Sequence, residues 1–287
     1  MSIRRRFREL IARPEIVVLV GVHDALSARL AASLGFEALL AGGNAATGTL
    51  LGEPDLGQLN MGEYVAHYGR IADASEVPVL VDGDTGFGGV HNVRKMVQAF
   101  ERAGVAGLFF EDQVFPKRCG YFEGKGVIPA VEMVSKIKAA LDARRDPDFV
   151  IEARTDALGV LGIDAAIERA QMYAEAGADL TFVQGADRFE QLARICREVP
   201  CPQMANVSQA AGAQSAMSLG EMQKAGAAAV IFPIAAMLAA AGGMKRALTA
   251  LLRDGSLAAV QNELMDFEDY KKLVGVAEFQ EREKKYQ

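Results

Sequence analysis

Val79-Leu80-Val81-Asp82-Gly83-Asp84-Thr85-Gly86 is a short apolar run that ends in two carboxylates. The apolar run 105–110 ends in the same way, in the segment Glu111-Asp112-Gln113-Val114-Phe115-Pro116-Lys117-Arg118-Cys119-Gly120. Short continuous apolar runs are typical of parallel strands that are buried on both faces. Parallel α/β proteins bind their ligands at the carboxyl ends of such strands. The two segments therefore predict a parallel α/β fold with carboxylates gathered at one mouth.

Eight runs of this kind alternate with helical segments along the chain, without a break in composition. Strands are expected at residues 16–20, 38–40, 77–81, 105–110, 149–153, 180–183, 203–205 and 228–232, and helices at 24–34, 61–74, 92–103, 130–143, 163–176, 188–199, 219–225 and 235–253. This order predicts a single (β/α)8 TIM barrel over residues 1–255. A doubly wound sheet is the alternative, but it needs a glycine-rich phosphate loop after the first strand, and Gly21-Val22-His23-Asp24 is not one.

The composition is that of one large globular enzyme-sized domain. A length of 287 residues is usual for one barrel, and 51% hydrophobic and 24% charged residues allow a large core. The net charge of −6 argues against general nucleic-acid binding, which needs a basic surface, but it allows a small anionic substrate. Residues 256–287 hold two further helical pieces that a barrel does not need, so we expect this helical extension to cover a neighbouring subunit.

The cysteines, the N-terminal segment and the longest apolar run predict a cytoplasmic protein. Cys119, Cys196 and Cys201 form neither a paired metal spacing nor a disulfide framework, which predicts a reducing cytoplasm. Residues 1–10 are basic but lack the apolar region of a secretory signal, so they predict a surface helix. Pro233 interrupts the apolar run 227–241, which is therefore expected to be a buried strand and a buried helix rather than a membrane span.

The strand ends predict a metal site. Asp82, Asp84 and Glu111 are hard oxygen ligands, which suit Mg²⁺ or Mn²⁺ rather than zinc. Ordinary turn chemistry is the alternative for Asp-Gly and Asp-Thr-Gly, but two consecutive strand ends with carboxylates favour the metal. The long glycine-containing loop 113–127 that follows is expected to be a lid.

Two further side chains are candidates for catalysis. Cys119 lies beside Lys117 and Arg118, a setting expected to favour its thiolate, although these two cations could be plain solvated charges on the loop. Arg154 follows the fifth strand and is expected to bind a substrate carboxylate, with pairing to Glu152 or Asp156 as the alternative.

Four motifs resemble the isocitrate lyase/phosphoenolpyruvate mutase superfamily, and the resemblance runs over residues 7–286. They are Gly-Glu-Pro-Asp-Leu-Gly (52–57), Val-Asp-Gly-Asp-Thr-Gly-Phe-Gly (81–88), Glu-Asp-Gln-Val-Phe-Pro-Lys-Arg-Cys-Gly (111–120) and Ala-Arg-Thr-Asp-Ala (153–157). The Lys-Arg-Cys-Gly loop is similar to the lyase branch, which includes methylisocitrate and dimethylmalate lyases and relatives like carboxyphosphonoenolpyruvate mutase. Phosphoenolpyruvate mutases carry an Asn loop there.

The resemblance implies a (β/α)8 barrel, Mg²⁺ dependence, 2-oxo acid chemistry and a homotetramer in which C-terminal helices swap between neighbours. It implies that Asp82 ligates Mg²⁺ directly, and that three carboxylates hold the metal's waters, namely Asp55, Asp84 and Glu111. Cys119 resembles the acid that protonates the carbanion-like product, and Arg154 resembles a binder of the substrate carboxylate. The resemblance also implies that the carboxylate of the 2-oxo acid is bound by the segment after the second strand, here Ala41, Gly42, Gly43 and Asn44.

The departures from the family pattern lie in the half of the site that should hold the leaving fragment. Tyr121 stands where the lyases have His, and Gln184 where they have Glu. Ala41 replaces Ser, Leu39 replaces a Tyr proposed as base, and residues 206–214 have lost the family's Glu and Thr-Pro. The residues expected to bind this part of the substrate are Gly120, Tyr121, Gln184, Asn206 and Ser208. The pattern indicates retained metal chemistry with an altered substrate.

These observations predict a Mg²⁺-dependent carbon–carbon lyase with Cys119 as proton donor. Its substrate would be a 2-hydroxy di- or tricarboxylate of the 2-alkylmalate or methylisocitrate type, cleaved to a 2-oxo acid and a carboxylate. The alternatives are an oxaloacetate-type hydrolase or decarboxylase, a phosphonate C–P enzyme, and a barrel that binds metal without turnover. The Cys119 loop favours the lyase over the phosphonate enzyme. Beyond this small carboxylate and self-association, we expect no nucleic-acid or membrane partner.

Overall fold

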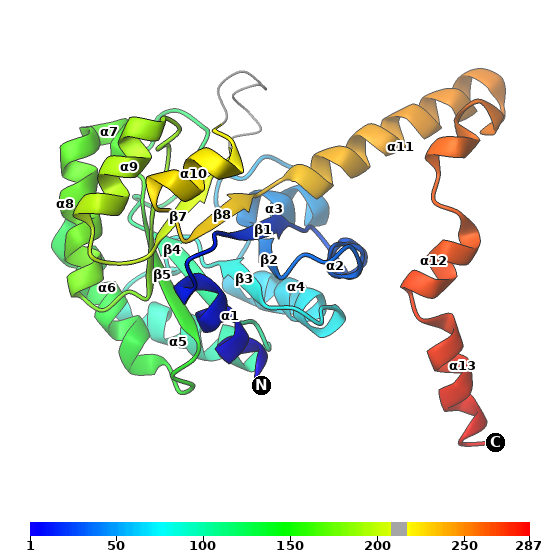
Figure 1. Cartoon of the computed structure of the whole chain (residues 1–287), viewed down its shortest axis with the longest axis horizontal. Coiled ribbons are helices and arrows are strands. Elements are labelled where there is room, and N and C mark those ends of the chain that lie inside the picture. The colour runs from blue at the N-terminus through cyan, green and yellow to red at the C-terminus, as the bar shows by residue number, and fades with distance from the viewer. Residues whose placement is uncertain (208–216) are drawn as a thin grey trace.

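The computed structural model describes residues 1–207 and 217–287 as a closed barrel of eight parallel strands (Figure 1). The strands follow one another around the barrel in chain order, and β8 closes on β1 with Ala229 opposite Val17. Their bounds are β1 Val17–Gly21, β2 Ala38–Ala41, β3 Val79–Asp82, β4 Gly107–Glu111, β5 Val150–Thr155, β6 Leu180–Val183, β7 Gln203–Asn206 and β8 Ala229–Phe232. The (β/α)8 barrel expected from the sequence is confirmed, and each strand overlaps the run that predicted it.

The helices up to α10 lie around the barrel, and those after it extend away from the barrel (Figure 1). Their bounds are α1 Ile3–Ala12, α2 Ala25–Ser33, α3 Gly43–Leu50, α4 Met61–Ala74, α5 Val90–Arg102, α6 Ala130–Ala143, α7 Leu158–Leu161, α8 Ile163–Glu175, α9 Phe189–Glu198, α10 Leu219–Ala225, α11 Ala235–Asp254, a 3-10 helix η1 Ala258–Glu263, α12 Phe267–Leu273 and α13 Val276–Lys284. The short helices α3 and α7 were not predicted. Of these, α3 matters for function because it begins at Gly43, inside the segment that is expected to bind the carboxylate of the 2-oxo acid.

Alternate residues of the strands build two apolar layers, because successive side chains of a strand point to opposite faces. Leu19, Leu80 and Val150 belong to the cluster inside the barrel, whereas Val81 and Ile151 belong to the layer between strands and helices. The residues of both layers are buried, so the strand ends that carry the polar residues stand on a packed core.

Helix α1 closes one end of the barrel. Phe7, Leu10 and Ile11 are buried and join the cluster inside the barrel, while the arginines face outward and pair with loop carboxylates such as Asp146. The predicted surface helix is therefore present, but one of its faces is core. Because this end is plugged, a ligand reaches the barrel from the opposite end, where the strands terminate.

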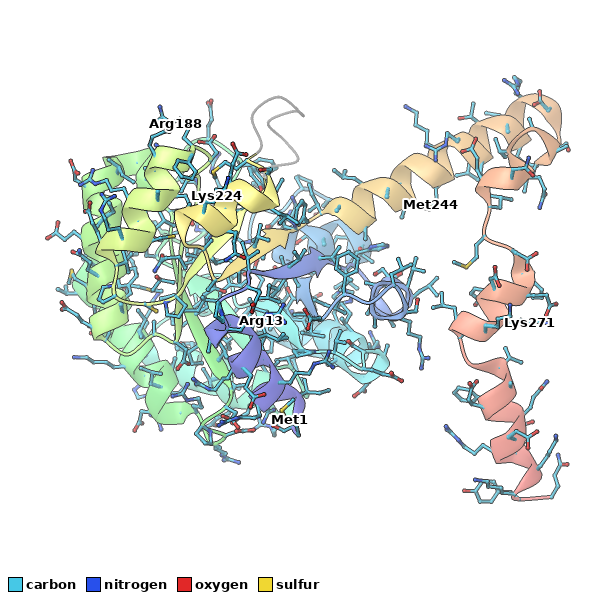
Figure 2. All side chains as sticks on the ribbon, viewed as in Figure 1. Met1, Arg13, Arg188, Lys224, Met244 and Lys271 are labelled. Atoms are coloured by element: carbon cyan, nitrogen blue, oxygen red, sulfur yellow. The ribbon has the colours of Figure 1, made fainter. Side chains whose placement is uncertain are left out.

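Helices α11 to α13 form an arm that leaves the barrel (Figure 1). Met244 on α11 and Lys271 on α12 lie on this arm, away from the strands (Figure 2). Within α11 only Ala250 is buried, and the helix is long and apolar enough to cross a membrane by length and composition. The sequence predicted the strand correctly, but its expectation of a buried helix is wrong for the single chain, whose described residues leave most of this helix exposed or half-buried. Its exposed apolar residues include Leu238, Met244, Leu248, Leu251 and Leu252.

Candidate active site

A small pocket lies where the strands end. Its cavity of about 50 Å³ has room for a few water molecules. It is lined by residues from the strands β2 to β8 or the turns that follow them, from the loop that holds Asp55, and from the lid, which we define as residues 113–127. Eleven of the residues singled out in the sequence line it: Gly42, Gly43, Asn44, Asp55, Asp82, Cys119, Gly120, Tyr121, Arg154, Gln184 and Asn206. Asp84, Glu111 and Ala41 are buried and do not line the pocket, and Ser208 lies outside the described residues.

Asp82 is the best-oriented carboxylate of the site. It is the last residue of β3, and its two oxygens accept backbone N–H groups from Gly43 at 2.9 Å and Asp84 at 2.8 Å. A Cβ at Gly43 would lie 2.9 Å from the Asp82 carboxylate and 2.9 Å from the Tyr64 hydroxyl. Only glycine allows this close approach of α3 to β3, which explains part of the glycine-rich segment read from the sequence.

The turn after β3 brings a second carboxylate into place. Asp84 has a φ of 49°, a conformation that non-glycine residues rarely adopt and that is frequent at functional sites. Its carbonyl accepts the backbone N–H of Glu111 at 2.8 Å, so the ends of β3 and β4 are joined. Tyr64 Oη, which the sequence gave no reason to single out, lies 3.4 Å from Asp84 Oδ1.

Lys117 from the lid is buried within this carboxylate cluster. Its Nζ lies 2.7 Å from Asp55 Oδ2 and 2.7 Å from Asp84 Oδ1, and only 2% of the side chain is exposed. Burial alone would lower the pKa of Lys117, but the surrounding carboxylates, Asp84 first, hold that pKa well above its usual value. The reading of Lys117 as a solvated loop charge is wrong, because the lid carries it into the site.

The cluster retains negative charge that Lys117 does not balance. Burial raises the pKa of Asp84 to about 7 and that of Glu111 well above its usual value. Asp55 Oδ1 is buried without a hydrogen-bond partner in the described residues. A divalent cation would relieve both costs.

The donor set fits Mg²⁺ or Mn²⁺ held largely through water. The four side chains of the cluster are the carboxylates of Asp55, Asp82, Asp84 and Glu111. These hard ions prefer carboxylate ligands, and Mg²⁺ usually keeps several of its waters. Within residues 1–207 and 217–287 no three His, Cys, Asp or Glu side chains stand close enough to ligate one ion together. The direct role expected for Asp82 and the water-mediated roles expected for Asp55, Asp84 and Glu111 stay predictions.

Cys119 belongs to the lid and is buried, with 7% of the residue exposed. Its backbone N–H donates to Asp55 O at 3.2 Å, and Asn44 Nδ2 donates to its Sγ at 3.4 Å. Burial raises the pKa of the Cys119 thiol. The expectation that its basic neighbours favour a thiolate is therefore wrong, since Lys117 is engaged by carboxylates and desolvation dominates. A thiol that stays protonated suits a proton donor.

Arg154 lies at the end of β5 and is held by carboxylates on two sides. Its Nε and Nη2 donate to Asp156 at 2.9 and 3.1 Å, and its Nη1 lies 3.2 Å from Glu111 Oε2. It pairs with Asp156 and not with Glu152, yet it still lines the pocket. A Cβ at Gly120 would lie 2.5 Å from Arg154 Nη2, so glycine lets the lid rest on the guanidinium.

A chain of neutral groups spans the other half of the pocket. Tyr121 Oη donates to Asn206 Oδ1 at 3.0 Å, and Asn206 Nδ2 donates to Gln184 Oε1 at 3.3 Å. The three residues that depart from or flank the family pattern thus form one hydrogen-bonded unit between the lid, β7 and β6. Apolar side chains complete this wall, namely Phe182, Ile231, Pro233 and Ile234.

Two supporting residues were missed by sequence reasoning. Gln113 clamps the base of the lid by donating to Glu111 Oε1 at 3.0 Å and to Arg118 O at 2.9 Å. Asp112 accepts hydrogen bonds from Thr155 and Tyr173 outside the pocket. Both belong to the Glu-Asp-Gln segment that follows β4, and that segment was the available signal.

Comparison with known proteins agrees with this geometry. The family model described as phosphoenolpyruvate phosphomutase matches residues 7–252. The chain is 39% identical to 2,3-dimethylmalate lyase of Eubacterium barkeri over 286 residues, covering 100% of this chain and 99% of the relative. It is 38% identical to 2-methylisocitrate lyase of Shewanella oneidensis, covering 96% of this chain and 94% of the relative.

Among solved structures, the fold is similar to that of oxaloacetate acetylhydrolase in complex with the inhibitor 3,3-difluorooxalacetate. The TM-score is 0.92 at 32% identity, and the match covers 99% of this chain and 97% of that one. Relatives of this similarity include curated lyases that cleave carbon–carbon bonds, and the chain is an enzyme of that kind. The match over most of its length shows that the chain belongs to the phosphoenolpyruvate mutase/isocitrate lyase superfamily.

Proposed function

We propose that the protein is a Mg²⁺-dependent lyase that cleaves an alkylated 2-hydroxydicarboxylate to a 2-oxo acid and a second carboxylate. The observation that carries this proposal is the pairing of a buried, protonated Cys119 with a carboxylate cluster in one small pocket. The similarity to 2,3-dimethylmalate and 2-methylisocitrate lyases supports this class of reaction.

The residues of the chain divide the reaction between the two halves of the pocket. Asp82, with Asp55, Asp84 and Glu111 around it, would hold Mg²⁺, which when bound supplies stabilisation of the negative charge that develops on the substrate oxygen. The first turn of α3 offers the free backbone N–H groups of Asn44 and Ala45 to the carboxylate of the 2-oxo acid.

Cys119 completes the cleavage. The C2 hydroxyl gives its proton to water, and its oxygen forms the carbonyl of the 2-oxo acid as the bond between C2 and C3 breaks. The electron pair of that bond stays on C3 of the leaving fragment, which then needs a proton. The Cys119 thiol can deliver that proton, because burial keeps it protonated and the lid holds it against the pocket. Arg154 lies across the pocket from α3 and is suited to the second carboxylate of the substrate.

The charge of the pocket favours a dicarboxylate over a tricarboxylate. Lys117 and Arg154 are the cations that line the described pocket, and each is already engaged by two carboxylates. The remaining polar lining near the leaving fragment is neutral, and segment 208–216 contains no charged residue. A third substrate carboxylate would be buried without a cation, and burying an unpaired charge costs on the order of several kcal/mol.

The test is a panel of substrates with the purified enzyme. Pyruvate release should be measured from 2,3-dimethylmalate and 2-methylisocitrate, and the release of oxalate and of pyruvate from oxaloacetate, each with Mg²⁺ and with excess chelator. We expect 2,3-dimethylmalate to give a kcat/KM at least about 10-fold above that of 2-methylisocitrate, as one unpaired carboxylate implies. Hydrolysis of oxaloacetate to acetate and oxalate, with both alkylated acids untouched, would contradict the lyase.

The oxaloacetate reaction is the second candidate function. The observation in its favour is the similarity of the whole fold to oxaloacetate acetylhydrolase. Hydrolysis of oxaloacetate also breaks the bond between C2 and C3 and needs a proton on the leaving carbon. The apolar wall formed by Phe182, Ile231 and Ile234 favours the alkylated acids instead.

We further propose that the protein is a cytoplasmic homotetramer in which the arm α11–α13 packs on a neighbouring copy. The exposed leucines of α11 support this, because apolar faces of this size are usually covered. Coverage by another copy would also leave α11 no apolar face for a membrane. Light scattering on the purified protein should give four times the 30.7 kDa of one chain, and a stable monomer would contradict the assembly.

A further inference from the structure

The far side of the lid is tied to the barrel by one basic residue. Lys125 Nζ donates to Gly120 O within the lid at 2.7 Å and to Asp156 Oδ1 after β5 at 2.8 Å. Only 12% of the Lys125 side chain is exposed. A single ammonium group therefore bridges the backbone next to Cys119 and a fixed point of the barrel.

Asp156 is a rigid anchor for this bridge. Its carboxylate is fully buried and accepts two hydrogen bonds from Arg154, and its backbone N–H donates to Asp112 Oδ1 at 3.0 Å. Asp112 is itself held by Arg169 and by two hydroxyl groups. The anchor of the lid is therefore also the group that orients the guanidinium lining the pocket.

The other side-chain contacts of the lid lie elsewhere, and among them Tyr121 reaches Asn206 at the end of β7. Lys117 and the Cys119 backbone attach the lid to the metal side of the pocket, and Gln113 attaches its base. In the described part of the lid beyond Tyr121, Lys125 is the residue whose side chain reaches a strand end. Removing its ammonium group would leave Gly120 O without this donor, and the stretch of the lid after Tyr121 would lose its ion pair with the end of β5.

We propose that Lys125 is a positioning residue whose ion pair with Asp156 holds the lid shut and sets the Cys119 thiol over the pocket. This inference rests on the proposed function in that Cys119 is the proton donor. An exposed ion pair would contribute little to holding the lid. This pair is shielded and shares its carboxylate with Arg154, so its loss acts on the geometry of both sides of the pocket.

The first test measures access to the thiol and does not depend on activity. Full-length protein is treated with iodoacetamide, and labelling of the Cys119 peptide is followed by mass spectrometry, which separates it from Cys196 and Cys201. We expect Lys125→Met to raise the labelling rate about 10-fold or more, Lys125→Arg to stay within about threefold of wild type, and Lys138→Met to leave it unchanged. Lys138 is an exposed lysine of α6 and controls for the lost charge.

The second test separates positioning from folding. For the alkylated malate that the enzyme cleaves, we expect Lys125→Met to lower kcat about 10- to 100-fold with KM within about threefold, and Lys125→Arg to recover most of kcat. If Lys125→Met left the labelling rate of Cys119 unchanged, or if Lys138→Met raised it as much as Lys125→Met does, the proposal that Lys125 holds the lid shut would be overturned. A freely labelled thiol with unchanged kcat would overturn the positioning role. Absence of any lyase activity would refute the proposed function, while the labelling result would still decide whether Lys125 holds the lid.

Discussion

Glu152 gives the sharpest prediction about stability. It lies two residues after Val150 on β5, so its side chain points into the barrel interior as that of Val150 does, and it is fully buried. Neither of its carboxyl oxygens has a hydrogen-bond partner in the described structure. Burial raises the pKa of Glu152 to about 8, against the opposing influence of Arg154. We expect Glu152→Gln to make the stability of the barrel less dependent on pH.

The size of the effect follows from the difference between the folded and unfolded chains. An unfolded glutamate has a pKa of 4.5, so between that pH and about pH 8 the unfolded chain has lost a proton that the folded chain keeps. The free energy of unfolding therefore falls as the pH rises through this window, and the loss is complete above it. At about 1.4 kcal/mol for each pKa unit, the full loss is about 5 kcal/mol, of which about 3 kcal/mol is reached at pH 7.

Urea unfolding at about pH 5, 7 and 8.5 measures this directly. Wild type, Glu152→Gln and the surface control Glu168→Gln are compared in chelator at equal protomer concentration, since assembly shifts apparent stability. Other titrating groups are common to all three proteins, so they cancel in the differences. Relative to wild type, Glu152→Gln should gain about 4 kcal/mol between the lowest and highest pH. A difference that stays constant with pH would refute a buried, protonated Glu152.

Three further predictions concern the site and the arm. Cys119→Ser should lower kcat at least about 100-fold while Mg²⁺ still raises the melting temperature, because the change removes the proton donor and leaves the carboxylates; turnover at the wild-type rate would exclude this donor. Lys117→Met should cost about 3 kcal/mol of stability in chelator and recover much of it in Mg²⁺, since Asp55 and Asp84 lose their buried partner; equal loss with and without Mg²⁺ in urea unfolding would speak against a metal at the cluster. Leu248→Asp, on the exposed face of α11, should shift the protein from tetramer to smaller species in light scattering, and an unchanged mass would place that face outside the interface.

The barrel could be predicted because its signals are local. Strands buried on both faces leave continuous apolar runs, and the carboxylates of Asp82 and Glu111 follow directly from two of them. Strand ends of one barrel meet at one mouth, so these carboxylates could be placed together without knowing any distance. Gln184 and Asn206, which belong to the neutral hydrogen-bonded half of the pocket, were likewise identified from the sequence because they follow strands.

The rest depends on long-range packing that the sequence does not display. Helix α3 is made of Gly, Ala, Asn, Thr and Leu and has no periodic pattern, and its place is decided by the bond from Gly43 to Asp82. The burial of Lys117 depends on where the lid folds back. The same fold buries Cys119, and the burial of its own thiol raises the pKa that was expected to be low. The exposure of α11 depends on which chain covers it. The swapped arm and the boundary at residue 255 stay predictions.

The measurement that tests the central claim most directly is the product balance for 2,3-dimethylmalate. Cleavage between C2 and C3 gives one pyruvate and one propionate, and both can be quantified by NMR in the presence of Mg²⁺ and of chelator. Our account predicts equal amounts of the two products with Mg²⁺ and neither with chelator. Products that form equally well in chelator, or pyruvate without propionate, would contradict a metal-dependent carbon–carbon lyase at this site.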